Sequence, residues 1–192
     1  VVLMWRDGSS YQAIATAQDP AQGLVLADAY PNQGHVFYHQ DVLRVRERLS
    51  ETLATKQLAD LTVISVLYDR LPAIERMLAQ PELKQRSAFI DLRDQTLLEI
   101  DDQEFASINA LADNDARMAA LASYAQQTKD VPRAKQARRT ITSIIRARDD
   151  QAWSVVQSAK TDRDKLSAVE AYLALPQPAK QTEAIALHSG IS

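Results

Sequence analysis

The sequence has no cysteine and little glycine. Its 192 residues include only four Gly and seven Pro. The absence of Cys excludes disulfide bonds, thiolate metal sites and cysteine nucleophiles, although it suits a reducing cytosol and a periplasm equally well. The scarcity of Gly argues against a glycine-rich loop that cradles phosphate.

Long hydrophobic runs and a strong excess of charge are also missing. No segment reaches 18 consecutive apolar residues, so we expect no membrane span. A net charge of -3 and a pI near 5.6 give no overall attraction to nucleic acid. The chain starts at Val1 inside a predicted strand and without Met, so we expect a trimmed or processed N-terminus.

Turn signals divide the first 40 residues into short segments. Asp7-Gly8 is a hairpin dipeptide, and Asp19-Pro20 and Pro31-Asn32-Gln33-Gly34 indicate further turns. Four or five strands in so short a stretch predict a small antiparallel β-barrel over residues 1–40. The predicted strands are Val1–Trp5, Tyr11–Ala17, Leu24–Ala29 and Val36–Tyr38, with a possible fifth at Asp41–Val45.

This order of runs and turns resembles SH3-like and Sm-like barrels. The resemblance implies RNA binding, or an aromatic cage for methylated side chains, for which the candidates are Trp5, Tyr11, Tyr30, Phe37 and Tyr38. The interpretation we favour is that these rings fill the interior of a very small barrel. Four acidic residues against the single base Arg6 in residues 1–41 argue against RNA.

Residues 41–187 are dominated by helix-forming residues and contain an internal repeat. Residues 73–81 align with 168–176, and a third copy lies at 120–125. With Met77, Tyr124 and Tyr172 taken as equivalent, the copies are 47 and 48 residues apart. Nineteen residues before these three positions stand Leu58, Phe105 and Trp153.

The matched positions are three or four residues apart, which puts each set on one helix face. We predict long helices near 41–70, 82–112 and 133–160, and short ones near 72–80, 115–128 and 164–175. Asp113–Asp115 and Thr161–Asp164 should cap two short helices, and Pro72 should stand near the first position of another. The predicted fold is mainly α with a small N-terminal β module. About three long-helix/short-helix units stack as a solenoid or bundle, followed by a frayed tail at 188–192.

The last copy resembles tetratricopeptide repeats in its order of large, small, aromatic and Pro residues, carried by Trp153, Ala159, Tyr172, Leu173, Pro176 and Ala184. The period is longer than that family's 34 residues, and the family's Gly and neighbouring Tyr of the first helix are absent. The resemblance implies a scaffold or adaptor that binds peptides or partner domains, without transferable binding residues. The combination of barrel and repeat is also similar to bacterial envelope scaffolds, which favours the periplasm or cell envelope.

The segment 133–148 carries six bases and no acid: Arg133, Lys135, Arg138, Arg139, Arg146 and Arg148. Lys135, Arg138, Arg139 and Arg146 share one helix face, opposite Ala137, Ile141, Ile144 and Ile145. Such a face can hold an acidic partner, phospholipid head groups or RNA phosphates. The alternative is a solvated face neutralised by Asp149 and Asp150 and by the acidic cluster Asp101, Asp102 and Glu104.

Candidates for chemistry are few. His35 and His39 beside Asp41 could be proposed as zinc ligands, but no convincing third ligand follows, and His188 falls in the predicted tail. The carboxylates near Asp101 could serve acid–base chemistry, although a solvated face is the simpler interpretation. We therefore expect no catalytic residue, metal, cofactor or small-molecule substrate.

The leading hypothesis is a non-enzymatic scaffold or adaptor within a larger assembly that binds protein partners, with an acidic surface on a partner as the candidate for segment 133–148. The alternative is an RNA-associated protein that uses the barrel or segment 133–148, although the overall charge disfavours nucleic acid. A third hypothesis is an enzyme whose site is completed by another chain or by residues that precede Val1.

Overall fold

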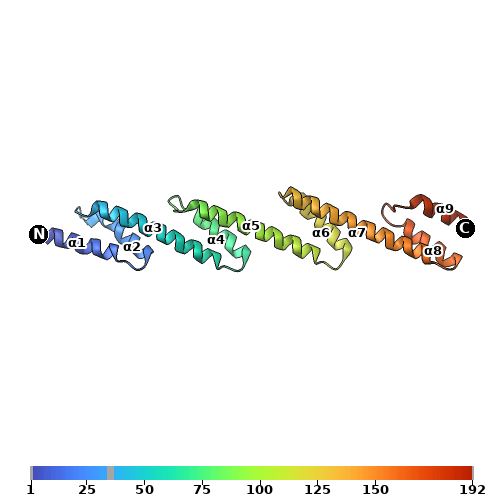
Figure 1. Ribbon diagram of the computed structural model, residues 1–192, viewed down its shortest axis with the longest axis horizontal. Helices are drawn as coiled ribbons and strands as arrows, with labels where there is room; N and C mark the ends of the chain where they lie inside the picture. Colours follow the sequence, from blue (N-terminus) through green and yellow to red (C-terminus); the bar gives the residue numbers. More distant parts are fainter. Residues whose placement is uncertain (1, 34–36, 192) are drawn as a thin grey trace. The chain divides into compact units, whose positions relative to one another are not determined.

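The computed structural model describes residues 2–33 and 37–191. These residues form nine α-helices and one short 3-10 helix, and they contain no strand (Figure 1). The elements in chain order are α1 (Val2–Ala15), α2 (Pro20–Ala29), η1 (Pro31–Gln33), α3 (His39–Thr62), α4 (Leu67–Leu78), α5 (Arg86–Asn109), α6 (Asn114–Gln127), α7 (Val131–Ser158), α8 (Asp162–Leu173) and α9 (Gln181–Ile191). The chain divides into two compact units, residues 1–103 and 104–192, with the boundary inside α5.

The β-barrel predicted for residues 1–40 is wrong, because α1 and α2 occupy most of this segment. Asp7-Gly8 lies within α1, where the Asp7 side chain is buried. Asp19 is the N-cap of α2 and accepts a hydrogen bond from Ala21 N, with Pro20 at the start of the helix. The dipeptides that suggested hairpin turns are therefore parts of helices. Of the strand predicted at 36–38, Val36 lies outside the described residues, and Phe37 and Tyr38 form a turn.

Gly23 has a packing role rather than a role in a turn. It is buried within α2. A Cβ atom at this position would lie 2.8 Å from Leu49 Cδ1 and 3.0 Å from Ala17 Cβ. The missing side chain allows α2 to approach α3 closely.

Two of the predicted helix caps are confirmed and one is wrong. The Asp113 carboxylate accepts hydrogen bonds from Asp115 N and Ala116 N, and Thr161 Oγ1 accepts one from Asp164 N. Pro72, expected at the first position of a helix, instead lies inside α4, because α4 already begins at Leu67. The long helix expected at 41–70 accordingly ends at Thr62.

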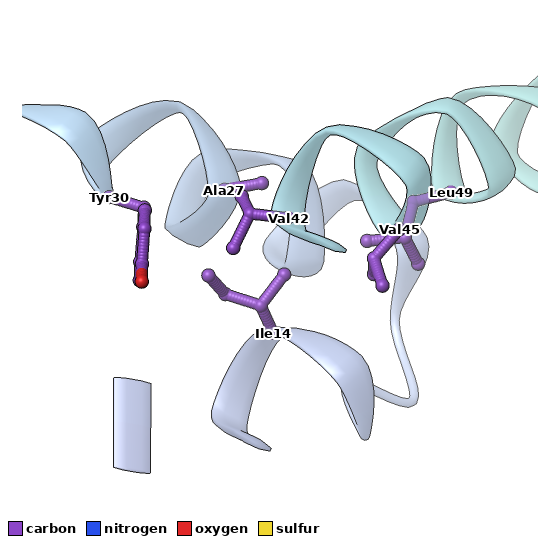
Figure 2. Packing of buried hydrophobic residues seen from close by; sticks show 6 residues of the cluster. All are labelled: Ile14, Ala27, Tyr30, Val42, Val45 and Leu49. Atoms are coloured by element: carbon purple, nitrogen blue, oxygen red, sulfur yellow. The ribbon is translucent and has the colours of Figure 1, made fainter. Parts of the chain in front are cut away.

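Each of four hydrophobic cores takes side chains from three consecutive helices. Figure 2 shows the first core, in which Ile14 of α1 reaches toward Ala27 of α2 and Val42 of α3. The buried members of the second core are Ala54, Leu61, Ile74, Phe89 and Leu92. Those of the third are Phe105, Leu121, Tyr124, Ala125, Ala134 and Ala137. Those of the last are Trp153, Val156, Val169, Tyr172 and Ala184. The helices α3, α5 and α7 each contribute one half to one core and the other half to the next.

The predicted unit was a long helix followed by a short one, with the core completed by stacking onto a neighbouring unit. In the structure, the first half of the helix that follows the short one completes each core. The predicted number of units is wrong, since a further copy occupies the segment assigned to the barrel. Tyr30 stands 47 residues before Met77, and it is buried in the first core.

A buried hydrogen-bonded group joins the three helices of the last core. The Tyr172 hydroxyl donates to Asp149 Oδ1 at 2.9 Å, and Ala179 N donates to the same oxygen at 3.0 Å. Lys180 N donates to the Tyr172 hydroxyl at 2.8 Å. Asp149 lies in α7, Tyr172 in α8, and residues 179 and 180 in the turn before α9. We call this arrangement the Asp–Tyr lock.

The first core contains the same lock at the same spacing. The Tyr30 hydroxyl donates to Asp7 Oδ1, Phe37 N donates to Asp7 Oδ2 at 2.8 Å, and Tyr38 N donates to the Tyr30 hydroxyl at 3.2 Å. In both cores the partners stand 23, 30 and 8 residues apart in the chain. Because the two locks have identical spacing, the first and last copies of the repeat have the same local structure.

A ring contact accompanies the lock. The Lys180 ammonium lies 5.1 Å from the centroid of the Trp153 ring, and the equivalent Tyr38 ring is stacked on Tyr11 with centroids 5.0 Å apart. In the third copy in chain order, which contains Tyr124, the Arg133 guanidinium lies 5.4 Å from the centroid of the Phe105 ring. In these three copies, a residue near the start of the third helix of the core thus covers an aromatic ring of the first helix.

The second copy in chain order, which contains Met77, lacks both members of the lock. Ala54 and Met77 stand 23 residues apart where the other copies carry Asp and Tyr. Ala54 is buried and Met77 packs against the same core. A buried carboxylate without its hydroxyl partner is costly, so the two positions are energetically coupled.

We therefore predict that Asp149→Ala and Tyr172→Met are non-additive. Each single change leaves buried polar groups of the lock unsatisfied and should lower the free energy of unfolding by about 1–3 kcal/mol. The double variant reproduces the second copy, so its loss should be smaller than the sum of the single losses by about 1 kcal/mol or more. Urea unfolding followed by circular dichroism measures the cycle; purely additive losses would contradict the coupling.

The lock also predicts a loss of stability at alkaline pH. Burial and the hydrogen bond to Asp7 raise the pKa of Tyr30 to about 12, and burial raises the pKa of Tyr172. The folded state keeps these protons above pH 10, where the unfolded chain releases them, so stability should fall as the pH rises from about 10 to 12. Urea unfolding at pH 9 to 11.5 tests this. Tyr30→Phe should show a shallower decline, and an identical slope in the variant would refute the assignment.

Candidate functional site

Four bases form a row on the outward side of α7. Lys135, Arg138, Arg139 and Arg146 are exposed. Together with Thr142 and Ser143 they line an open hollow of about 460 Å³. We call these four bases the basic stripe.

The register of α7 fixes the direction of the stripe. Ala134 and Ala137 are buried in the third core, and Ile141 and Ile144 pack against that core. At 3.6 residues per turn, these positions lie on the opposite side of the helix from the stripe. Ile145, predicted on the apolar face, is 39% exposed at its edge. The stripe therefore points away from the core.

Arg133 and Arg148, the other two bases of the predicted site, do not belong to the stripe. The Arg133 guanidinium packs on Phe105. Arg148 Nη1 lies 3.4 Å from Asp115 Oδ1 of α6. Both side chains are only partly exposed, and both stabilise contacts within the second unit.

The bases of the stripe have no acidic partner within the described residues. None of the four makes an ion pair there, so the acidic cluster near Asp101 does not neutralise them. Bases elsewhere in the chain do find partners at short range: Arg46 with Asp28 at 2.6 Å, Lys84 with Glu47 at 2.6 Å and Arg70 with Glu99 at 2.9 Å. The stripe is thus a concentration of positive charge without an internal counter-charge.

A second hollow continues the stripe toward the start of α7. It has a volume of about 660 Å³ and is lined by Val131, Pro132, Lys135, Gln136 and Arg139. Val131 is 75% exposed and stands four residues before Lys135, so it lies on the same side of the helix. Sequence analysis missed Val131, Thr142 and Ser143 as surface neighbours, although the helical spacing that selected the bases also includes them.

The residues considered for metal binding are scattered. His35 lies outside the described residues, and His39 is exposed at the start of α3. Asp41 Oδ1 lies 3.6 Å from Arg44 Nη1, and His188, in α9, lies 3.6 Å from Glu170. Within 2–33 and 37–191, no three His, Asp or Glu side chains are grouped as metal ligands.

The acidic cluster lies near the end of α5. Asp101 is partly buried, and Asp102 and Glu104 are exposed. All three make interactions within the protein. Asp102 and Glu104 therefore lie on the surface, whereas Asp101 is partly covered.

The five aromatic residues considered for a cage have different environments. Tyr30 is buried in the lock, and Tyr11 and Tyr38 are stacked on each other with their ring planes 8° apart. Trp5 and Phe37 are 80% and 59% exposed. Trp5, Tyr11 and Tyr38 border an open hollow of about 850 Å³ on α1, which is too wide and too flat for a cage around one side chain.

Within the described part of the chain, none of the helices combines the length and apolar character needed to cross a bilayer.

The chain matches no known protein family, no curated protein and no solved structure. Neither the tetratricopeptide repeat nor the SH3-like and Sm-like barrels are therefore supported as relatives.

The exposure of the stripe predicts a chemical reactivity. Arg138, Arg139 and Arg146 should react with phenylglyoxal well before Arg70, whose side chain is 13% exposed and paired with Glu99. Mass spectrometry after brief modification of the folded chain gives the rates for individual sites. If Arg70 were modified as fast as Arg138, the contrast between free and paired guanidinium groups would not exist in solution.

Proposed function

We propose that the chain is a non-enzymatic interaction module that holds an acidic protein partner on the basic stripe of α7. The observation that carries this proposal is the set of four exposed bases without an ion pair in the described residues. Isolated charges of one sign in a row attract opposite charge and increase the rate of encounter with a complementary surface.

The framework around the stripe supports this role. The apolar side of α7 is held in two cores, so the helix presents the bases without having to fold on binding. A preorganised surface loses less conformational entropy when a partner docks. The stripe also lies beside the exposed Val131, which adds an apolar contact to a charged one.

An RNA partner fits these observations less well. Proteins that bind single-stranded nucleic acid combine Lys and Arg side chains with exposed aromatic rings, on which the nucleobases stack. Segment 131–148 contains no aromatic residue, and the chain has a net charge of -3. RNA binding is therefore treated as a competing outcome of the experiments.

Selection from a peptide library tests the proposal. The full chain is immobilised and used to select binders from a phage library of random 20-residue peptides. We expect acidic sequences to be enriched, and to lose binding when Arg138→Gln, Arg139→Gln and Arg146→Gln are combined.

The matched control combines Lys129→Gln, Lys160→Gln and Arg163→Gln, which removes three exposed bases elsewhere in the same unit. This control has the same net charge as the stripe variant, so it should keep the selected peptides. If no acidic peptide is enriched, or if both triple variants lose binding equally, the stripe is not the binding surface.

A further inference from the structure

We infer that the occupant of the basic stripe is an acidic α-helix that lies along α7 with one row of its carboxylates facing the stripe. This inference rests on the proposed function and specifies the structure of the partner. It follows from the spacing of the bases, from the groups between them and from the surroundings of the stripe.

The spacing of the bases matches a helical row. Lys135 and Arg146 are 11 residues apart, which corresponds to about 16 Å along α7, and Arg138 and Arg139 stand about 4.5 and about 6 Å further along the helix axis than Lys135. Carboxylates every three or four residues on a partner helix repeat at the same rise of about 4.5–6 Å. Two helices packed at a small crossing angle can therefore keep their rows in contact over the whole stripe.

An extended partner fits this spacing less well. Side chains on one face of a strand are about 6.6–7 Å apart, so the row falls out of step with the bases over 16 Å. Long Arg side chains can absorb part of this mismatch, at the cost of conformational freedom. The rigid register of α7 thus favours a helix over a strand.

The gap between Arg139 and Arg146 is filled by hydroxyl groups. Thr142 Oγ1 donates its proton to the Arg138 carbonyl oxygen at 3.0 Å. Ser143 is exposed and lines the hollow together with the bases. Because the Thr142 proton is used in this bond, a carboxylate placed one turn after Arg139 would accept from the Ser143 hydroxyl and would meet no negative charge there.

The surroundings disfavour a membrane as the occupant. Helices that bind at a bilayer surface insert an apolar face beside their basic one. The apolar face of α7 is taken up by the third core, where Ala134 and Ala137 are buried. The one strongly exposed apolar side chain beside the stripe, Val131, suits a single side chain at the end of a partner helix.

Fluorescence anisotropy with designed peptides tests the inference on the full chain. The first probe is an alanine-based helix with four Glu three or four residues apart on one side and a Leu at one end. The second has the same composition with the four Glu spread evenly around the helix, and circular dichroism verifies that both are helical. A third carries the four Glu in a proline-interrupted peptide that cannot form a helix.

We expect the first probe to bind about tenfold more tightly than either of the others, because it alone can pair with several bases at once. The stripe variant, Arg138→Gln with Arg139→Gln and Arg146→Gln, should remove this preference. The control variant, Lys129→Gln with Lys160→Gln and Arg163→Gln, should retain it. Binding should weaken as salt rises from 0.05 to about 0.5 M, since exposed ion pairs are screened.

The other outcomes separate the two proposals. If all three peptides bind equally and lose binding in the stripe variant, the helical partner is overturned while the proposed function stands. If no peptide shows binding that depends on the stripe, both fail. If a 20-nucleotide single-stranded RNA, or vesicles of phosphatidylglycerol and phosphatidylcholine, bind the stripe more tightly than the first probe, an acidic helix is not the occupant.

Discussion

In the first and last cores, the arrangement of the helices depends on a buried carboxylate that accepts hydrogen bonds from a tyrosine hydroxyl and from the turn before the next helix. In the last core, Asp149 and Tyr172 together receive the N–H groups of residues 179 and 180. The group thereby joins α7, α8 and the start of α9 with directional contacts that apolar packing alone does not supply. In the first and last cores, this directional component therefore fixes the turn that precedes the third helix of the core.

The N-terminal segment shows why local sequence patterns failed. Asp7-Gly8 and Asp19-Pro20 have the composition of turns, and short apolar runs separate them. What makes Asp7 compatible with a helix interior is its contact with Tyr30, 23 residues away, and a long-range partner leaves no local signal. The repeat did contain the information, because Tyr30 stands one period before Met77. The periodicity of 47 residues is therefore a better guide here than the turn dipeptides.

The surface of α7 was partly predictable. The helical register alone separates Lys135, Arg138, Arg139 and Arg146 from Arg133 and Arg148, because the last two fall on the side of the helix that faces the core. The absence of an internal counter-charge could not be derived in the same way. It depends on which acids reach α7, as the ion pair between Arg148 and Asp115, 33 residues earlier in the chain, illustrates. Tertiary packing decides such pairs.

Comparison of the copies separates the positions whose residues the packing of the cores constrains from the outward positions whose charge can vary. Val42, Phe89 and Ala137 are equivalent and buried, whereas the outward positions beside them differ in charge. Where α7 carries Arg139, Thr142 and Arg146, the equivalent outward positions are Arg44, Glu47 and Glu51 in α3, and Asp91, Asp94 and Leu98 in α5. The cores therefore do not demand a basic face, since the same framework tolerates a mixed face and an acidic one. The positive charge of the basic stripe is therefore a property of the surface of α7 and is not imposed by the packing of the cores.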